Sequence, residues 1–210
     1  MTLQQLFGIP RPIIQAPMAG VQGSALTVAV SNAGGLGSLP CATLELDTMR
    51  AELSAICAQT TKPFSVNFFC HTQPEFSAER ERVWRAALSP YFAEFGIDPQ
   101  AIPKMPGRSP FGSEAADVLD EFRPAVVSFH FGLPSADLLT RVRGWGAKIL
   151  SSATTLDEAR WLEAHGVDAI IAQGIEAGGH RGSFLSEDLT TQVGTFALVP
   201  QIVQDRKSVV

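Results

Sequence analysis

The chain has 210 residues, which is long enough for one domain with a substantial buried core. Hydrophobic residues make up 45% of it and charged residues 18%, a composition that excludes a disordered or fibrous protein. The net charge of -5 argues against nucleic acid and anionic membranes as partners, because both attract surfaces rich in Lys and Arg.

The cysteines and the N-terminus bear on the cellular compartment. The three cysteines form no C-x-x-C pair and their number is odd, so we expect neither a disulfide framework nor a metal site. Residues 1–12 lack the apolar run after a basic start that marks a signal peptide. No stretch approaches the ~20 apolar residues of a membrane helix. We therefore expect a cytoplasmic protein with reduced thiols.

Short apolar runs alternate with amphipathic segments from the N-terminus onward. The run PIIQAPM predicts a buried strand, and apolar residues at steps of three and four predict a helix over 44–59. In chain order we expect a strand at 12–18, a helix at 24–32, a strand at 35–39, a helix at 44–59 and a strand at 64–69.

The segment 71–123 interrupts this alternation. Residues 79–88 have a helical pattern, but five prolines from Pro90 to Pro110 interrupt the sequence that follows. A helical pattern resumes at 113–122. Because long loops within compact domains are commonly lids or binding loops, we interpret this segment as an insertion between the third and fourth strands.

The alternation then returns. The runs AVVSFHF and AIIAQ are typical of strands buried on both faces of a parallel sheet that helices cover. We expect strands at 125–131, 148–151 and 169–173, and helices at 135–145, 155–165 and 193–203.

Two α/β architectures fit this order of elements, a (β/α)8 barrel of the TIM type and a doubly wound open sheet. Polar or glycine-rich residues end almost every predicted strand. In a barrel all strand ends meet at the face that binds the ligand, whereas an open sheet needs such residues only at one crevice. The pattern favours the barrel. Because a whole barrel takes ~250 residues, we expect an incomplete one of about six βα units.

Three strand ends carry side chains suited to chemistry. His130 shares a strand face with Ser128, and an imidazole can accept a proton or, when protonated, attract an anion. A structural histidine bonded to the backbone is the alternative. Asn67 and Gln173 are amides, which offer both a donor and an acceptor.

A glycine-rich loop, AGGHRG at 177–182, follows the sixth predicted strand. Glycines let main-chain N–H groups approach an anion closely. The loop matches neither G-x-G-x-x-G nor a Walker P-loop, so a tight surface turn is an equal alternative on composition alone.

Three segments, PIIQAPMAG at 12–20, VVSFHFGLP at 126–134 and IIAQGIEAGGHRG at 170–182, occur together with NFFCH at 67–71. In combination they resemble the nitronate monooxygenases, formerly called 2-nitropropane dioxygenases. The first segment alone would indicate only a flavin-binding barrel. The similarity covers almost the whole chain.

The resemblance implies FMN bound noncovalently at the mouth of a TIM barrel. It implies oxidation of a small-molecule substrate, an alkyl nitronate, by O2 to a carbonyl compound and nitrite, without metal or nicotinamide. Two alternatives stay open: a flavin-dependent oxidoreductase like the enoyl-ACP reductases, which would need NAD(P)H, and a non-catalytic fragment of the flavoenzyme. The histidine of SFHFG disfavours the reductase. A homodimer is also left open.

The resemblance also assigns roles to residues. His130 matches a catalytic histidine near the reactive edge of the flavin, and His180 matches a second histidine in the substrate pocket. The positions that match cofactor-binding residues are Ala16, Pro17, Met18, Asn67, Gln173, Gly178 and Gly179.

The end of the chain departs from the resemblance. In the family, the helix that begins near Phe196 leads to further strands and two glycine-rich loops that hold the FMN phosphate. Residues 205–210 instead abandon the helical pattern. We expect 1–204 to be a partial FMN-binding TIM-barrel domain that holds the flavin weakly, and 205–210 to be a non-native tail.

Overall fold

The structure is a computed structural model that describes residues 2–102 and 108–205. It divides into two compact units, one of Met1–His71 with Pro110–Val210 and one of Thr72–Ser109. The first unit carries the sheet and the second carries most of the predicted insertion. In the described ranges, no helix is both long enough and apolar enough to cross a membrane.

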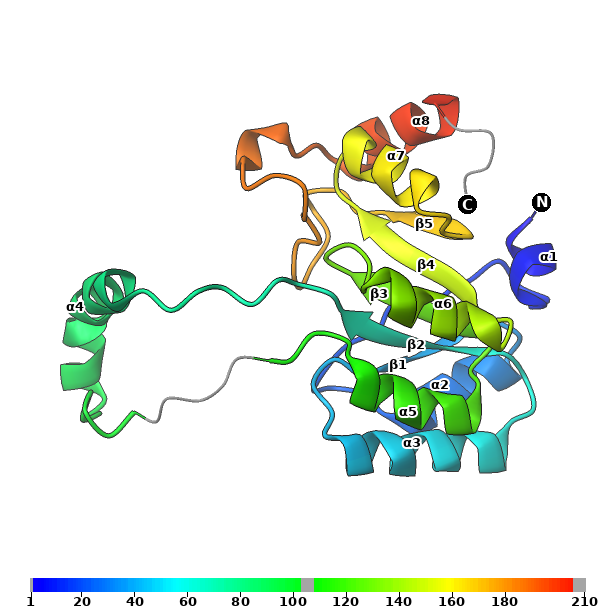
Figure 1. Cartoon of the computed structure of the whole chain (residues 1–210), viewed down its shortest axis with the longest axis horizontal. Helices are drawn as coiled ribbons and strands as arrows, with labels where there is room; N and C mark the ends of the chain where they lie inside the picture. Colours follow the sequence, from blue (N-terminus) through cyan, green and yellow to red (C-terminus); the bar gives the residue numbers. More distant parts are fainter. Residues whose placement is uncertain (1, 103–107, 206–210) are drawn as a thin grey trace. The chain divides into compact units, whose positions relative to one another are not determined.

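The sheet of the first unit has five parallel strands, paired in the order in which they occur in the chain (Figure 1). They are β1 (Gly37–Pro40), β2 (Phe64–Phe69), β3 (Val126–His130), β4 (Lys148–Ala153) and β5 (Ala169–Ala172). A doubly wound sheet reverses its strand order at a switch point, and this sheet has no reversal. The order is that of a barrel wall, which confirms the predicted fold class.

The first predicted strand, 12–18, is wrong. The segment forms only an isolated parallel bridge between Ile14 and Leu36, with two main-chain hydrogen bonds of 2.9 Å beside β1. The N–H groups that face β1 are those of odd-numbered residues such as Gln15, and Pro17 has none to donate, so the ladder cannot extend past it. The described wall therefore has five strands and one bridged segment in place of six strands.

Helices cover the outer face of the sheet (Figure 1). Alternating strand residues such as Val66, Val127 and Phe129 are buried against helical residues such as Leu53 and Leu119. The helices of this unit are α1 (Leu3–Phe7), α2 (Ser24–Asn32), α3 (Leu46–Gln59), α5 (Ser113–Phe122), α6 (Ala136–Gly144), α7 (Leu156–Ala164), the 3-10 helix η1 (Leu189–Thr191) and α8 (Thr195–Asp205). The predicted helices are confirmed to within a few residues.

The last helix bears on the predicted tail. α8 includes Asp205, the first residue of that tail, and the Asp205 carboxylate pairs with Arg160 of α7 at 2.7 Å. Asp205 is thus the last residue of helix α8. Residues 206–210 of the predicted tail lie outside the described residues.

The helix α1 covers the inner sheet face at the end where the strands begin. Its Leu6 and Phe7 are buried in one cluster with Val126, Leu150 and Ala169, which come from the N-terminal parts of β3, β4 and β5. Figure 1 shows α1 at the end opposite the arrowheads of β2 and β4. The inner face is therefore apolar at its base, and the carboxyl ends of the strands lie at the other end.

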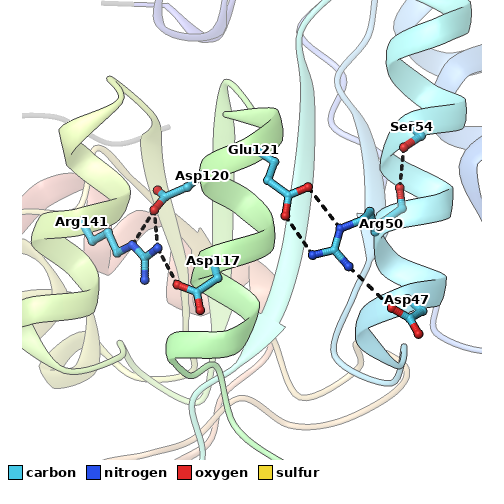
Figure 2. Close-up of polar contacts among 7 residues, drawn as sticks. All are labelled: Asp47, Arg50, Ser54, Asp117, Asp120, Glu121 and Arg141. Carbon is cyan, nitrogen blue, oxygen red and sulfur yellow. Dashed lines mark hydrogen bonds and ion pairs between the residues drawn. The ribbon is translucent and has the colours of Figure 1, made fainter.

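Ion pairs join neighbouring outer helices (Figure 2). Arg50 of α3 makes two hydrogen bonds of 3.1 and 2.8 Å to the Glu121 carboxylate of α5. Arg141 of α6 binds Asp117 of α5 at 2.7 Å and also contacts Asp120. These pairs fix α5 between its two neighbours on the outside of the wall.

The second unit contains α4 (Ala78–Glu94), which is longer than the predicted helix at 79–88. Pro90, expected to interrupt the helix, lies inside it. Proline cannot donate to the carbonyl four residues earlier, but the Ser89 hydroxyl donates to that carbonyl, of Ala86, at 2.9 Å. The side chain replaces the lost main-chain bond. No residue of α4 is buried.

Candidate active site at the carboxyl ends of the strands

The inner face of the sheet changes from apolar to polar along the strands. Alternation places His130 on the face of Val126, and Ser152 on the face of Leu150. Gln173 follows β5 in the same alternation from Ala169. The three polar side chains therefore come to the carboxyl end of the inner face, where barrels bind their ligands.

His130 is held by both of its ring nitrogens. Nδ1 lies 3.0 Å from the Ser152 hydroxyl, and Nε2 lies 3.0 Å from the main-chain oxygen of His180. A carbonyl oxygen only accepts, so Nε2 carries the hydrogen in the neutral ring, and Nδ1 accepts from Ser152. The network fixes the tautomer as well as the orientation of the imidazole.

Burial lowers the pKa of His130 below its ordinary value of 6.5. The hydrogen bond to the His180 carbonyl acts in the opposite direction, the charges of His180 and Arg181 lower the pKa further, and that of Glu158 raises it. Desolvation is the largest of these causes, so the neutral imidazole is favoured near neutral pH. His130 is thus suited to accept a proton.

Gln173 and Arg181 fix the last part of the glycine-rich loop. The Gln173 amide donates to the His180 carbonyl at 3.0 Å and accepts from the Gly182 N–H at 2.8 Å. Arg181 donates to the Gln173 carbonyl at 3.2 Å, contacts the Gly174 carbonyl, and donates to the Gln192 side chain at 2.6 Å. The loop is therefore folded back onto the end of β5.

Gly182 lies directly against the imidazole of His130. A Cβ atom at Gly182 would be 2.6 Å from His130 Cε1, closer than any ordinary contact. By contrast, a Cβ atom at Gly178 or Gly179 would meet nothing within 4 Å, and Gly179 has a φ of +77°. The loop combines a close approach at Gly182 with an open stretch of main chain at Gly178 and Gly179.

Aromatic rings surround the histidines. The Phe131 ring centroid lies 4.6 Å from that of His130, and the Phe69 centroid lies 5.3 Å from that of His180. His71 contacts both phenylalanines, with centroids 6.4 and 6.2 Å away. Phe131 has a φ of +66°, which is rare for a residue with a side chain. His71, the last residue of NFFCH, therefore also lies in this group.

Two further polar residues of this region, Ser152 and Glu158, were not identified as site residues from the sequence. Ser152, at the end of a predicted strand, is the Nδ1 partner of His130. Glu158 of α7, only 1% exposed, accepts from Thr154 and from the Phe184 main chain. The pattern Thr155-x-x-Glu158 is that of a capping box, and it was the available signal for Glu158.

The other predicted cofactor residues lie outside the His130 network, as far as the described contacts go. Asn67, 8% exposed, donates to the Ser128 hydroxyl at 2.9 Å on the neighbouring strand β3. Ala16, Pro17 and Met18 follow the bridge beside β1, and Met18 is 44% exposed. The structure brings together His130, His180 and Gln173, with Asn67 one strand away.

Comparison with known proteins agrees with the resemblance to nitronate monooxygenases. A family model described as nitronate monooxygenase matches residues 1–207. A nitronate monooxygenase of Paraburkholderia phytofirmans is 47% identical over 208 residues, which are 97% of this chain and 56% of that protein. One of Pseudomonas aeruginosa is 47% identical over 93% of this chain and 56% of its own length. The chain thus spans about half the length of these curated relatives.

Among solved structures, a nitroalkane oxidase is more similar to the chain than FabK is. A nitroalkane oxidase from Streptomyces ansochromogenes superposes with a TM-score of 0.83 at 38% identity, covering 99% of this chain and 59% of that one. FabK from Thermotoga maritima is more distant, with a TM-score of 0.68 at 25% identity over 99% of this chain and 52% of that one. The chain belongs to the nitronate monooxygenase family.

Proposed function

We propose that this chain serves the FMN-dependent oxidation of alkyl nitronates by O2 to a carbonyl compound and nitrite. The observation that carries the proposal is the meeting of His130 and Gln173 at one atom, the His180 carbonyl oxygen, at the carboxyl end of the sheet. The nitronate monooxygenases and the nitroalkane oxidase named above support the reaction class. A reductase that needs NAD(P)H is not favoured, because FabK is the more distant structure.

The residues present fit FMN. The main chain at Gly178 and Gly179 is open to a flat ring or an anion, because no atom lies within 4 Å of an added Cβ. Asn67 adds a buried amide one strand from His130, and Ala16, Pro17 and Met18 would form a further wall. Gln173 holds the loop in this structure, so a direct contact to the flavin would require its amide to leave His180 and Gly182. FMN, when bound, would supply the electron acceptor.

His130 and His180 would contact the substrate. Nε2–H of His130 is a hydrogen-bond donor held in a fixed direction, and a nitronate oxygen in place of the His180 carbonyl would accept the same bond. To accept a proton from a nitroalkane on Nδ1, neutral His130 would first have to release its hydrogen bond from the Ser152 hydroxyl. His180 and the rings of Phe69 and Phe131 would enclose the alkyl part.

We also propose that residues 1–204 form the flavin-binding part of the protein and that the protein is cytoplasmic. The thiol of Cys41 is buried, that of Cys70 is partly buried, and Cys57 is exposed, all three without a disulfide. Burial raises the pKa of Cys41 and of Cys70, so both thiols stay protonated and unreactive near neutral pH.

Anaerobic mixing of the FMN-loaded protein with ethylnitronate tests the proposal. We expect the absorbance of oxidised flavin to fall without NAD(P)H, and nitrite to form when O2 is admitted. His130→Asn should slow the bleaching of the flavin by about 10- to 100-fold, the usual effect of a lost hydrogen bond to a charged group. His165→Asn, which changes an exposed histidine of the outer layer, is the matched control. Flavin bleaching by NAD(P)H alone would favour the reductase, and failure to bind flavin would favour a non-catalytic fragment.

A further inference from the structure

Glu158 is a buried carboxylate that the proposed chemistry does not use. It is 1% exposed, and among the described residues it forms no ion pair with a Lys, Arg or His side chain. A buried charge is tolerated only when hydrogen bonds compensate for its lost hydration. The partners of Glu158 therefore indicate what this residue holds in place.

The two carboxylate oxygens of Glu158 bind two different segments. Oε2 accepts from the Thr154 N–H at 2.7 Å and from the Thr154 hydroxyl at 2.8 Å, at the end of β4. Oε1 accepts from the Phe184 N–H at 2.7 Å and the Leu185 N–H at 3.3 Å, just after the glycine-rich loop. Glu158 thus joins this loop to the strand that carries Ser152.

This position differs from that of an ordinary helix cap. Thr155 is the N-cap of α7, and its hydroxyl accepts from the Glu158 N–H at 3.2 Å. In a capping box the glutamate side chain would bind back to the N–H of the cap residue. Here the carboxylate reaches Thr154 and the loop instead.

The segment that Glu158 holds lies on His130. Gly182, two residues before Phe184, lies against the imidazole, and a Cβ atom at Gly132 would be 3.2 Å from the Phe184 ring. Arg181 and Gln173 fix the chain at Gly182, and Glu158 fixes it at Phe184. We infer that Glu158 is a positioning residue that acts through the loop 182–185 to keep His130 enclosed and in one tautomer. The inference rests on the proposed function only in naming His130 as the group to be positioned.

The test compares the 210-residue chain with Glu158→Gln and Glu158→Asp by NMR of 15N-labelled histidines. The chain has only four histidines, so their signals can be assigned. Glutamine presents an NH2 group to at least one pair of donors, and aspartate is one methylene shorter than glutamate, so both variants release the loop. Asp157→Asn, a change at the neighbouring exposed carboxylate, is the control.

The direction of the His130 titration separates two roles for Glu158. Burial lowers the pKa of His130 and the charge of Glu158 raises it. If Glu158 acts by enclosing His130, release of the loop raises the pKa toward its ordinary value and mixes the tautomers. If only its charge matters, Glu158→Gln lowers the pKa further, which would overturn the inference.

Trypsin cleavage after Arg181 gives a second readout. Cleavage requires the loop to open locally, so we expect it to be about tenfold faster or more in both Glu158 variants and unchanged in Asp157→Asn. His165 reports on α7, because its ring stacks on Trp161 with centroids 3.7 Å apart. Unchanged His130 signals and cleavage, or equal disturbance of His165 and His130 in both variants, would overturn the inference. Neither readout uses FMN or a nitronate, so a failed oxidation assay leaves this test intact.

Discussion

His130 and Gln173 share one hydrogen-bond acceptor, the main-chain oxygen of His180, which lies 3.0 Å from His130 Nε2 and 3.0 Å from Gln173 Nε2. The two side chains lie 43 positions apart in the sequence (173 − 130) and come from the ends of β3 and β5. Their common acceptor couples the orientation of the imidazole to the conformation of the glycine-rich loop. Changes in the loop should therefore be detectable at His130.

Removal of the Ser152 hydroxyl should destabilise the fold. Ser152 is 6% exposed and lies 3.0 Å from His130 Nδ1, so Ser152→Ala leaves a buried ring nitrogen without its donor. We expect the free energy of unfolding in urea to fall by about 1 kcal/mol, the usual value for a buried hydrogen bond. Ser152→Thr should restore most of the loss.

A second buried serine provides the control for this prediction. Among the described residues, the Ser65 hydroxyl oxygen is one of two buried side-chain atoms without a hydrogen-bond partner. Ser65→Ala therefore removes an uncompensated polar group and should leave the stability unchanged or raise it. Equal losses for Ser65→Ala and Ser152→Ala would show that the bond to His130 contributes nothing.

The close approach of Gly182 to His130 predicts different effects for two glycines of one loop. In Gly182→Ala the new methyl group would lie 2.6 Å from His130 Cε1, so the ring must move and break its bonds to Ser152 and His180. We expect a loss of about 1–3 kcal/mol in the free energy of unfolding, as for other overpacked sites.

Gly178→Ala is the matched variant, because its methyl group would meet nothing within 4 Å. Its stability should equal that of the wild type, while FMN affinity, measured by flavin fluorescence, should fall if Gly178 lies against the cofactor. For Gly182→Ala, a His130 NMR signal unchanged from that of the wild type would contradict the close contact between Gly182 and the imidazole.

The low pKa of His130 predicts how stability depends on pH. Burial lowers this pKa in the folded state below the ordinary 6.5, so between the two values the unfolded chain binds a proton that the folded chain does not. The free energy of unfolding therefore decreases as the pH falls below about 6.5, and the loss is complete below the folded-state pKa. His130→Asn should remove this part of the slope in urea titrations between pH 7 and 5.

His165→Asn is the control for the pH experiment, since it leaves His130 in place and should keep the slope. A slope that is the same in His130→Asn and the wild type would show that other groups cause the pH dependence.

The repeat of buried strands and amphipathic helices was sufficient to predict the barrel wall. The strand at 125–131 is an example: alternation placed Val127 and Phe129 on one face and His130 on the other, as the structure has them. The first predicted strand did not form because PIIQAPM has a strand-like apolar pattern, and apolarity does not report the N–H group toward β1 that Pro17 lacks.

The site was predictable only where a residue ends a strand. His130 and Gln173 were identified that way, because parallel strands end at one edge and alternation decides the face. Ser152 was not, since its role depends on the register of β4 against β3. Glu158 was not, since its role depends on which loop lies against it. Sequence periodicity carries neither kind of information. The helix through Pro90 failed for a similar reason, because the compensating Ser89 bond is a local geometric detail.

The ion pairs in Figure 2 predict a salt-dependent contribution to helix packing. Arg141 of α6 binds both Asp117 and Asp120 of α5. The side chains of the three residues are between 33% and 65% exposed. Pairs in contact with water are weakened by added salt. Arg141→Ala should therefore lower the Tm slightly at low ionic strength, and the difference should vanish in about 1 M NaCl, where the Debye length is about 3 Å.

Arg82→Ala is the control: it breaks a pair within the single helix α4 and should leave the melting transition of the sheet unit unchanged at either salt concentration. A Tm difference for Arg141→Ala that persists in high salt would mean that the arginine stem packs against α5, and that its charge is of minor importance.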